Sequence, residues 1–320
     1  MPPRSPLPAR AGERGPLRVG LGLAALGRPG YLNLGHGHDL GGDRSPAALQ
    51  ARSFDVLDAA YAGGIRYLDA ARSYGRGEEF LGAWLRERDP DDVVVGSKWG
   101  YVYTAGWEVD ADPPEVKHHD VDTFRRQLEE TRANLGDRLA LYQIHSATAD
   151  SGVLENDAVL DALAALRADG VAIGLSTSGT SQAQTLDRAL ALELFDTAQV
   201  TWNLHERAAG PALARAHDAG LGVIVKEALA NGRLAARGAS PVLDRLADDL
   251  GVTPDAVALA AVLAQPFVDV VLSGAATVDA LRSNLAAVEV TLDSGALAAL
   301  DALVEDSRAY WTARGEMAWN

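Results

Sequence analysis

The 320-residue chain contains no cysteine and only three lysines, Lys98, Lys117 and Lys226, against 26 arginines. Without cysteine it can form neither disulfides nor thiolate metal sites, and this composition is compatible with the cytoplasmic location that we predict. Lysine is a compact point charge that can perturb the pKa of a neighbour, whereas arginine is a spread, permanently charged fork. Because arginine carries nearly all of the positive charge, a lysine at the end of an apolar run favours a chemical role.

The chain also lacks long apolar runs and an excess of basic residues. No stretch approaches the roughly 20 consecutive apolar residues of a membrane-spanning helix. The net charge of −15 opposes binding to nucleic acid or to an anionic membrane, so the expected partner is a small molecule. Composition indicates no particular oligomeric state.

Residues 1–16 are rich in proline, arginine and glycine and lack the apolar centre of a signal peptide. We predict a disordered tail over this stretch and a single folded domain over residues 17–320. With 48% hydrophobic residues, the chain can bury a large core.

Short apolar runs alternate with helical patterns along this domain. Eight runs are predicted strands: Leu17–Leu23, Arg66–Asp69, Val93–Lys98, Ala140–His145, Ala172–Ser176, Ala198–Asn203, Gly222–Lys226 and Val270–Ser273. The helical patterns are Pro46–Ala62, Gly77–Glu87, Asp120–Asn134, Asp157–Asp169, Ser181–Leu192, Ala208–Ala219, Pro241–Leu250 and Pro254–Ala264. Such alternation indicates a parallel sheet, and eight units match a closed (β/α)8 TIM barrel, an α/β fold. The alternative is an open doubly wound sheet.

One motif favours the open sheet. Gly20-Leu21-Gly22-Leu23-Ala24-Ala25 fits the loose dinucleotide-binding form G-x-G-x-x-[GA]. That fingerprint requires a helix to begin at the motif, whereas Leu26-Gly27-Arg28-Pro29-Gly30 interrupts a helix. We therefore interpret these glycines as structural and predict the closed barrel, with long loops on its C-terminal face.

Two segments without regular pattern follow predicted strands. The segment Trp99–His119 carries Trp99, Tyr101 and Trp107, which we predict to line a substrate pocket. The segment Tyr31–Asp43 carries an HxH pair. A metal-dependent enzyme that uses these histidines is an alternative, with His36, His38, His118 and His119 as its candidate ligands. No carboxylate or third histidine stands at ligand spacing beside the HxH pair, so we predict no metal site.

Four polar side chains end predicted strands or follow them closely. Asp69 ends the second strand and Tyr74 follows it, while Lys98 and His145 end the third and fourth. In a barrel all four converge at one mouth. A tyrosine has an ordinary pKa near 10, and a nearby lysine cation favours its phenolate. We expect Asp69 to hold Lys98 in place, and His145 to orient a carbonyl to which Tyr74 donates a proton.

These segments resemble the aldo-keto reductase family. Tyr67-Leu68-Asp69-Ala70-Ala71-Arg72-Ser73-Tyr74-Gly75 is similar to its signature, and Val95–Trp99 and Leu141–His145 are similar to its lysine and histidine motifs. The resemblance implies a barrel that binds NADP(H), or less often NAD(H), without a Rossmann domain. It also implies reduction of an aldehyde, ketone or sugar lactol, with Tyr74 as general acid/base supported by Asp69, Lys98 and His145.

The resemblance also implies cofactor contacts, with departures from the family pattern. Ser176 and Gln199 correspond to residues that hold the nicotinamide carboxamide, and Thr177 replaces the usual asparagine beside Ser176. Lys226 stands where the family has an aromatic residue that stacks on the nicotinamide. We expect it to contact a cofactor phosphate or to pair with Glu227.

The last predicted strand and the helix after it correspond to the phosphate and adenine sites of the family. The resemblance assigns Gly274 to the phosphate side and Asn284 to the adenine. The basic pair that grips a 2′-phosphate falls on Gly274 and Ala280, so NADP(H) is the family default and NAD(H) the alternative. A different class of function is a reductase-like barrel that binds cofactor as a regulatory subunit. The four polar residues favour the enzyme.

Overall fold

The computed structural model describes residues 6–7, 17–236 and 238–320. Within them, eight parallel strands close into a barrel in the order β1-β10-β9-β8-β7-β6-β3-β2. These strands are β1 (Val19–Gly22), β2 (Tyr67–Asp69), β3 (Val94–Trp99), β6 (Leu139–Ala147), β7 (Ala172–Thr177), β8 (Thr197–Thr201), β9 (Gly222–Lys226) and β10 (Val270–Ser273). Each lies on one predicted strand, so the predicted (β/α)8 TIM barrel is confirmed.

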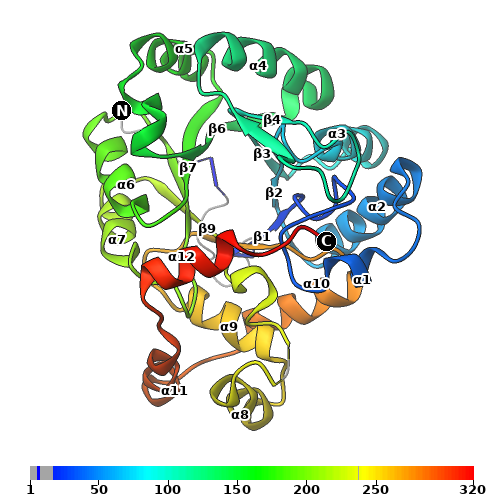
Figure 1. Cartoon of the computed structure of the whole chain (residues 1–320), viewed down its shortest axis with the longest axis vertical. Helices are drawn as coiled ribbons and strands as arrows, with labels where there is room; N and C mark the ends of the chain where they lie inside the picture. The colour runs from blue at the N-terminus through cyan, green and yellow to red at the C-terminus, as the bar shows by residue number, and fades with distance from the viewer. Residues whose placement is uncertain (1–5, 8–16, 237) are drawn as a thin grey trace.

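Helices surround the barrel in a ring (Figure 1). The helices that follow the strands are α2 (Pro46–Ala62), α3 (Gly77–Arg88), α4 (Val121–Leu135), α5 (Asp157–Ala168), α6 (Gln182–Ala191), α7 (Gly210–Asp218), α8 (Pro241–Leu250), α9 (Pro254–Leu263) and α10 (Val278–Leu285). The sequence sets several of their ends. The hydroxyls of Ser45 and Ser240 accept backbone N–H groups at the starts of α2 and α8, each followed by a proline at the first helical position.

The remaining helices and strands lie outside the repeating strand–helix units of the barrel. They are α1 (His36–Leu40), β4 (Tyr101–Tyr103), β5 (Glu115–Lys117), α11 (Ser294–Ala299) and α12 (Ser307–Gly315). Short 3-10 turns cover Gly136–Arg138, Ala149–Ser151, Val153–Glu155, Ala230–Gly232, Ala286–Glu289 and Leu300–Leu303. The strands β4 and β5 form an antiparallel hairpin inside the segment Trp99–His119. The segment shows neither a continuous apolar run nor a sustained period-two alternation, so sequence analysis found no regular structure there.

Side chains alternate between the inside and the outside of the barrel. Along β3, Val95 and Trp99 belong to the core packed under the helices, whereas Lys98 reaches Asp69 and so points inward. The interior is tight around Tyr67. A Cβ on Gly20 would lie 2.8 Å from its Cδ1, and a Cβ on Gly96 would lie 2.6 Å from its hydroxyl. These glycines let the Tyr67 ring fill the barrel below Asp69.

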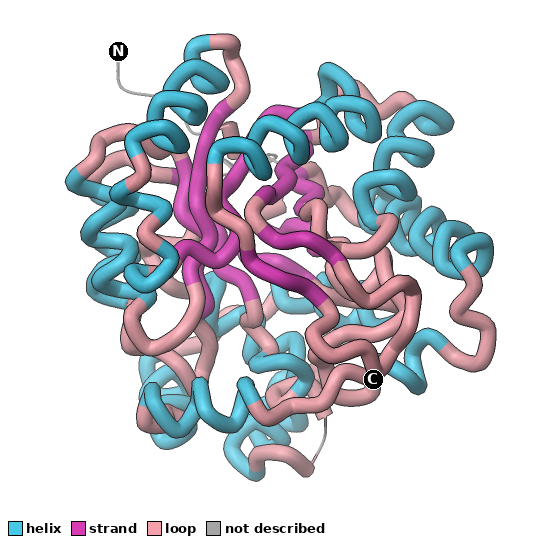
Figure 2. The backbone as a smooth tube through the Cα atoms, turned by 45° about the horizontal axis from the view of Figure 1, so that its top comes forward, coloured by secondary structure: helices cyan, strands magenta, loops and turns pink. Residues whose placement is uncertain are grey.

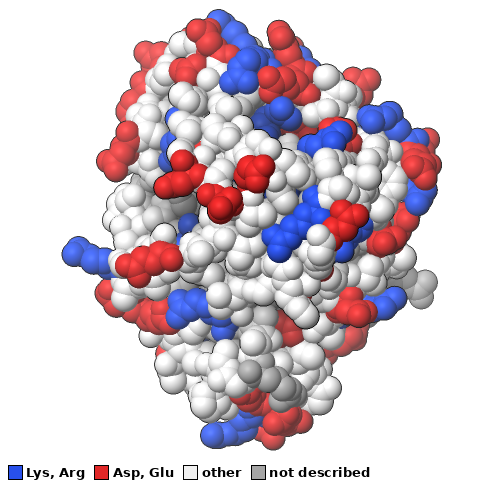
Figure 3. Space-filling view, turned by 45° about the vertical axis from the view of Figure 1, so that its right-hand side comes forward, with Lys and Arg blue, Asp and Glu red and all other residues white. Residues whose placement is uncertain are grey.

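The chain's C-terminus lies among loops at one end of the barrel (Figure 2). The predicted tail, residues 1–16, lies outside the described residues except for Pro6 and Leu7. Leu7 is buried against Tyr67 and Leu141. None of the helices in the described part of the chain is long and apolar enough to cross a membrane. Acidic and basic side chains are interspersed over the face shown in Figure 3.

Candidate active site

A cavity of about 1050 Å³ opens at the C-terminal ends of the strands. It is lined by eight of the residues that sequence analysis assigned to a site: Asp69, Tyr74, Tyr101, His145, Gln199, Lys226, Gly274 and Asn284. Its volume lies at the upper end of the roughly 300–1,000 Å³ typical of small-molecule pockets. The barrel thus brings together residues predicted to take part in proton donation and most of the predicted cofactor-binding residues.

Lys98 and Asp69 form a buried ion pair at the floor of this cavity. Lys98 is fully buried, and its ammonium group donates to Asp69 Oδ2, to the Ala70 carbonyl at 2.9 Å and to Tyr74 OH at 3.3 Å. An ammonium group has three donors, so each has one acceptor. A buried pair is stable only when its remaining hydrogen-bonding capacity is satisfied, and this one meets that condition on the lysine side.

Asp69 accepts hydrogen bonds from its own strand and from two other strands of the barrel. Its Oδ1 accepts from Tyr67 OH at 3.1 Å, from Gln199 Nε2 at 2.9 Å and from Gln143 Nε2 at 3.5 Å. Gln199 borders the cavity, but its amide nitrogen is engaged by Asp69. These contacts fix the carboxylate, which in turn fixes the lysine beside Tyr74.

Tyr74 lies in the loop between β2 and α3, and the loop after β1 packs tightly against it. A Cβ on Gly27 would lie 2.2 Å from the Tyr74 carbonyl, and a Cβ on Gly75, whose φ is +57°, would lie 2.5 Å from the Gly27 carbonyl. Arg76 N also donates to Gly27 O at 2.8 Å. Glycine is required at both positions, and the close approach holds the tyrosine at the cavity edge.

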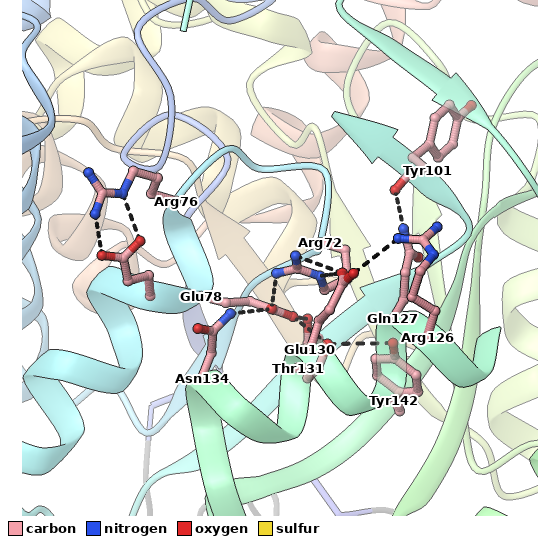
Figure 4. A network of polar contacts seen from close by, with 12 residues as sticks. Arg72, Arg76, Glu78, Tyr101, Arg126, Gln127, Glu130, Thr131, Asn134 and Tyr142 are labelled. Atoms are coloured by element: carbon pink, nitrogen blue, oxygen red, sulfur yellow. Dashed lines mark hydrogen bonds and ion pairs between the residues drawn. The ribbon is translucent and has the colours of Figure 1, made fainter. Parts of the chain in front are cut away.

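A buried carboxylate anchors the same loop from below (Figure 4). Glu78, 1% exposed, accepts from Arg72 NH1 at 2.6 Å and from Ser97 Oγ at 2.6 Å. It also accepts from Thr131 Oγ1 at 2.8 Å and from Asn134 Nδ2 at 3.2 Å. The network ties the β2–α3 loop to β3 and α4, the elements that place Lys98.

Burial raises the pKa of Tyr74 well above its ordinary value of 10, and the negative charge of Asp69 raises it further, against the opposing charge of Arg28. Sequence analysis expected Lys98 to lower this pKa. The difference arises because the phenol is desolvated and the charge of Lys98 is shared with Asp69. Tyr74 is therefore a protonated phenol throughout the neutral range, with Lys98 placed to stabilise the phenolate once the proton leaves.

His145 is a neutral imidazole beside Tyr74. Burial lowers its pKa well below 6.5, and the charges of Lys98 and Arg28 act in the same direction. Its ring meets Tyr74 edge-on with centroids 5.5 Å apart, and Tyr101 with centroids 5.0 Å apart. A neutral imidazole offers one donor and one acceptor, which suits it to bind a carbonyl or hydroxyl oxygen.

Other predicted site residues lie away from the cavity surface. Trp99 is fully buried against Phe124 of α4, because it follows Lys98 by one residue and so points outward. Trp107 donates from Nε1 to the Arg44 carbonyl at 2.8 Å and packs against the buried cluster that contains Leu40 and Phe80. Neither tryptophan is among the residues that border the cavity, whereas Tyr101 is.

Ser176 and Thr177 are both fully buried and do not border the cavity. Ser176 Oγ accepts from Ser146 N at 2.8 Å, and Thr177 Oγ1 has no hydrogen-bond partner among the described residues. Ser178, the next residue, does border the cavity. The chain after β7 therefore reaches the cavity at Ser178, the residue that follows the assigned pair Ser176 and Thr177.

Lys226 forms part of a buried charge cluster. Its Nζ donates to Thr201 Oγ1 at 2.7 Å and lies 3.5 Å from Glu227, which pairs with Arg314 of α12 at 2.6 Å. Burial lowers the pKa of Lys226. Burial opposes ionisation of Glu227, but Arg314 and Lys226 lower its pKa to about 2. The ion pair with Glu227 is the second of the two roles expected for Lys226.

The side of the cavity formed by α9 and α10, which we call the α9–α10 arm, is small and polar. It is bordered by Thr253, Asp255, Gly274, Ala275, Ala276, Ala280, Ser283 and Asn284. Asn284 Nδ2 donates to Asp255 Oδ2 at 2.7 Å, and Ser283 Oγ donates to Asp255 Oδ1 at 3.0 Å. Arg282 is exposed and pairs with Asp279 at 3.3 Å instead of bordering the arm.

Sequence analysis did not assign Arg28, Glu115, Asp255, Arg314 or Trp319 to the site, although all five border the cavity. Arg28 was visible only as part of a helix-breaking run. Trp319 and Arg314 come from the C-terminal segment, whose return to the barrel mouth no local pattern indicates. Among the described residues, no group of three or more histidine, aspartate or glutamate side chains could hold a metal ion.

Comparison with known proteins agrees with this geometry. A family model described as "Aldo/keto reductase family" matches residues 33–305. The aldo-keto reductase str7 of Strobilurus tenacellus is 25% identical over 321 residues, covering 90% of this chain and 88% of that protein. A D-threo-aldose 1-dehydrogenase of a Pseudomonas species is 29% identical over 220 residues, 63% of this chain and 67% of that protein.

A solved aldo-keto reductase of Bacillus halodurans, in its holo form, shares the fold. It is 20% identical to this chain with a TM-score of 0.70, over 93% of this chain and 97% of that protein. The family model covers well over half of the sequence. The chain therefore belongs to the aldo/keto reductase family, a family of oxidoreductases that use a nicotinamide cofactor on small carbonyl compounds.

Proposed function

We propose that this protein transfers a hydride between a nicotinamide cofactor and an aldehyde, a ketone or a sugar lactol, with Tyr74 as general acid/base. The observation that carries the proposal is the contact of Lys98 Nζ with both Asp69 and Tyr74 OH, at the edge of a cavity that His145 also borders. The relative named D-threo-aldose 1-dehydrogenase supports the sugar lactol as one substrate class.

Each of the four polar residues has its own part in the proposed reaction. The bound cofactor supplies or accepts the hydride. His145, as a neutral imidazole, binds the substrate oxygen, and Tyr74 gives that oxygen its proton during reduction. Lys98 then stabilises the phenolate through its 3.3 Å hydrogen bond, while Asp69 keeps the ammonium group in position.

The polar residues at the strand ends suit a nicotinamide ring. Ser178, which follows β7, and Gln199, on the neighbouring strand β8, both border the cavity. The Ser178 hydroxyl and the amide oxygen of Gln199 can each hydrogen-bond a carboxamide. Lys226 replaces the stacking aromatic, and Glu227, which lies between Lys226 and Arg314, offsets part of the positive charge near the ring. We infer that Ser176 and Thr177, which are buried beneath the cavity wall, help to hold Ser178 and the end of β7 in place.

The α9–α10 arm supports NAD(H), although the family resemblance favours NADP(H). Asp255 is 6% exposed and carries a carboxylate into the arm, and none of the residues that border the arm is a lysine or arginine. A 2′-phosphate needs cationic partners, whereas a carboxylate suits an unmodified ribose 2′-hydroxyl. We therefore propose NAD(H) as the preferred cofactor.

A substrate panel run with both cofactors tests the proposal. Aldehydes, ketones and aldoses are offered with NADH and NADPH or the oxidised forms, and binding of each cofactor is titrated by the quenching of tryptophan fluorescence. We expect turnover together with tighter binding of NADH. An Ala280→Arg variant is expected to improve NADPH binding about tenfold or more, as one charged hydrogen bond provides. Cofactor binding without turnover on any carbonyl would favour the regulatory alternative.

A further inference from the structure

Arg28 is a buried cation at the cavity with unused hydrogen-bond donors. It lies in the loop after β1 and is 2% exposed. Its NH1 donates to the Ser73 carbonyl and to Glu115 Oε2, both at 3.0 Å. Its Nε and Nη2 make no hydrogen bond to the described residues. Because a guanidinium carries five N–H donors, three are unpaired. The Nε donor is fully buried, so the two donors on Nη2 are those left for a ligand.

Aromatic rings fix the plane of this guanidinium. Its carbon lies 4.3 Å from the ring centroid of Trp319, 5.1 Å from that of Tyr31 and 5.2 Å from that of Tyr74. Tyr31 and Trp319 border the cavity as well. The free donors are therefore held beside the proton donor, in an apolar wall where an unpaired polar group is costly.

Glu115 supplies the complementary acceptor. It lies on β5, its side chain is 21% exposed, and it borders the same cavity. Oε2 is paired with Arg28, whereas Oε1 accepts no hydrogen bond from the described residues. Together Arg28 and Glu115 present free N–H donors and a free carboxylate oxygen next to Tyr74.

This combination fits hydroxyl groups better than it fits a carboxylate. A hydroxyl group both donates and accepts, so it can use the two members of the pair at once. The charge of Arg28 is offset by Glu115, whereas Asp69 is paired with Lys98, and Glu227 with Lys226 and Arg314. A carboxylate placed at Arg28 would also meet the carboxylate of Glu115, so the pair offers an anionic substrate little net attraction.

We propose that Arg28 and Glu115 are the specificity-determining residues for a neutral substrate with hydroxyl groups next to its reacting carbonyl carbon. The inference rests on the proposed function, because it places these hydroxyls beside the carbon that reacts at Tyr74. A substrate without them leaves buried donors and a carboxylate unpaired. Sites built for a substrate hydroxyl discriminate against the analogue that lacks it, by roughly 100-fold or more.

Three small aldehydes test the proposal: glyceraldehyde, propanal, which lacks both hydroxyls, and succinic semialdehyde, which carries a carboxylate. Their reduction is measured with the native protein, Arg28→Met, Glu115→Gln and the double variant. Arg282→Met, an exposed arginine away from the cavity, is the matched control. We expect the native protein to prefer glyceraldehyde over propanal by roughly 100-fold in kcat/KM.

The variants separate recognition from structure. Arg28→Met and Glu115→Gln should lose most of this preference through a higher KM for glyceraldehyde, and this loss should be many times larger than any change in kcat/KM for propanal. The double variant leaves no unpaired charge and remains informative where Arg28→Met folds poorly. Equal losses for glyceraldehyde and propanal, or a native preference for succinic semialdehyde, would overturn the inference. Absence of turnover on all three aldehydes would overturn the proposed function itself.

Discussion

Tyr74 has the contacts of a proton donor, and its hydroxyl can be removed without disturbing the floor of the cavity. Tyr74→Phe deletes one acceptor of Lys98 but leaves those from Asp69 and Ala70. We expect kcat for carbonyl reduction to fall by roughly 10²–10⁴-fold, the usual contribution of general acid catalysis. Stopped-flow reduction monitored by cofactor absorbance measures this loss. Cofactor affinity should stay within about twofold, because the ring remains.

The control for Tyr74→Phe is Tyr61→Phe, a phenol on α2 that does not border the cavity. It should reduce carbonyls at the native rate. Turnover by Tyr74→Phe at the native rate would show that another group donates the proton.

Replacing Lys98 should change both the free energy of unfolding and the pKa of Tyr74. Lys98→Met leaves Asp69 as a buried unpaired carboxylate, so we expect a loss of about 3–5 kcal/mol in the free energy of unfolding. The double variant Lys98→Met/Asp69→Asn should recover much of this stability without recovering activity. In the Lys98→Met protein that folds, the rise in the rate of alcohol oxidation with pH should move to higher pH. The pKa of Tyr74 increases because its phenolate loses the neighbouring cation. Urea unfolding and a pH–rate profile measure the two effects, and a profile of unchanged shape would contradict this role.

The alternation of inward and outward side chains along each strand explains which side-chain positions could be predicted. Lys98 and His145 end predicted strands in the sequence, and both face the interior. The same alternation places Trp99 outside, so its position was available from the sequence once Lys98 was taken as inward. Arg28 and Glu115 gave no comparable signal, because each lies in a segment whose path depends on contacts far along the chain.

At the scale of elements, the β2–α3 loop depends on Glu78 (Figure 4). Glu78→Gln removes the charge from hydrogen bonds that join this loop to β3 and α4, including the 2.6 Å contact with Arg72. We expect a loss of about 2 kcal/mol in the free energy of unfolding, typical of a charged hydrogen bond. Carbonyl reduction should also slow, because the loop carries Tyr74. Urea unfolding and steady-state kinetics provide the measurements.

The adjacent Glu79 is a matched control for Glu78. It lies on the same turn of α3 and is exposed, and among the described residues it pairs only with Arg76, at 2.7 Å. Glu79→Gln should change stability by less than about 1 kcal/mol, as exposed ion pairs do. Similar losses from both variants would show that burial of the Glu78 network adds nothing.

The eight barrel strands and the helices α2 to α9 could be predicted because apolar runs and helical patterns alternate along the chain, and this alternation marks even the three-residue strand β2. The helix α10 was indicated only by the family resemblance. The hairpin β4–β5 and the helix α12 could not be predicted. Tyr101–Tyr103 lies outside that alternation, and α12 packs through few buried side chains, chiefly Tyr310. Both elements are held by contacts with distant parts of the chain. Arg314 of α12, for example, pairs with Glu227 after β9.

For the whole molecule, buried histidines set the stability in acid. Burial lowers the pKa of His36 from 6.5 to about 4, and the charges of Arg44 and Arg28 act in the same direction. Burial likewise lowers the pKa of His119 to about 4 and that of His145 well below 6.5. Below pH 6.5 the unfolded chain takes up protons that the folded chain refuses. The stabilising contribution is therefore present above pH 6.5 and is lost as the pH falls toward 4.

His36 allows this effect to be measured on its own. At pH 5 its titration should lower the free energy of unfolding by about 2 kcal/mol relative to pH 7.5. His36→Phe removes the group from both states, so urea unfolding at the two pH values should show a pH dependence smaller by that amount. His38→Phe changes an exposed histidine of the same helix and should keep the native pH dependence. An unchanged pH dependence in His36→Phe would mean that this histidine takes up its proton equally in the folded and unfolded chains.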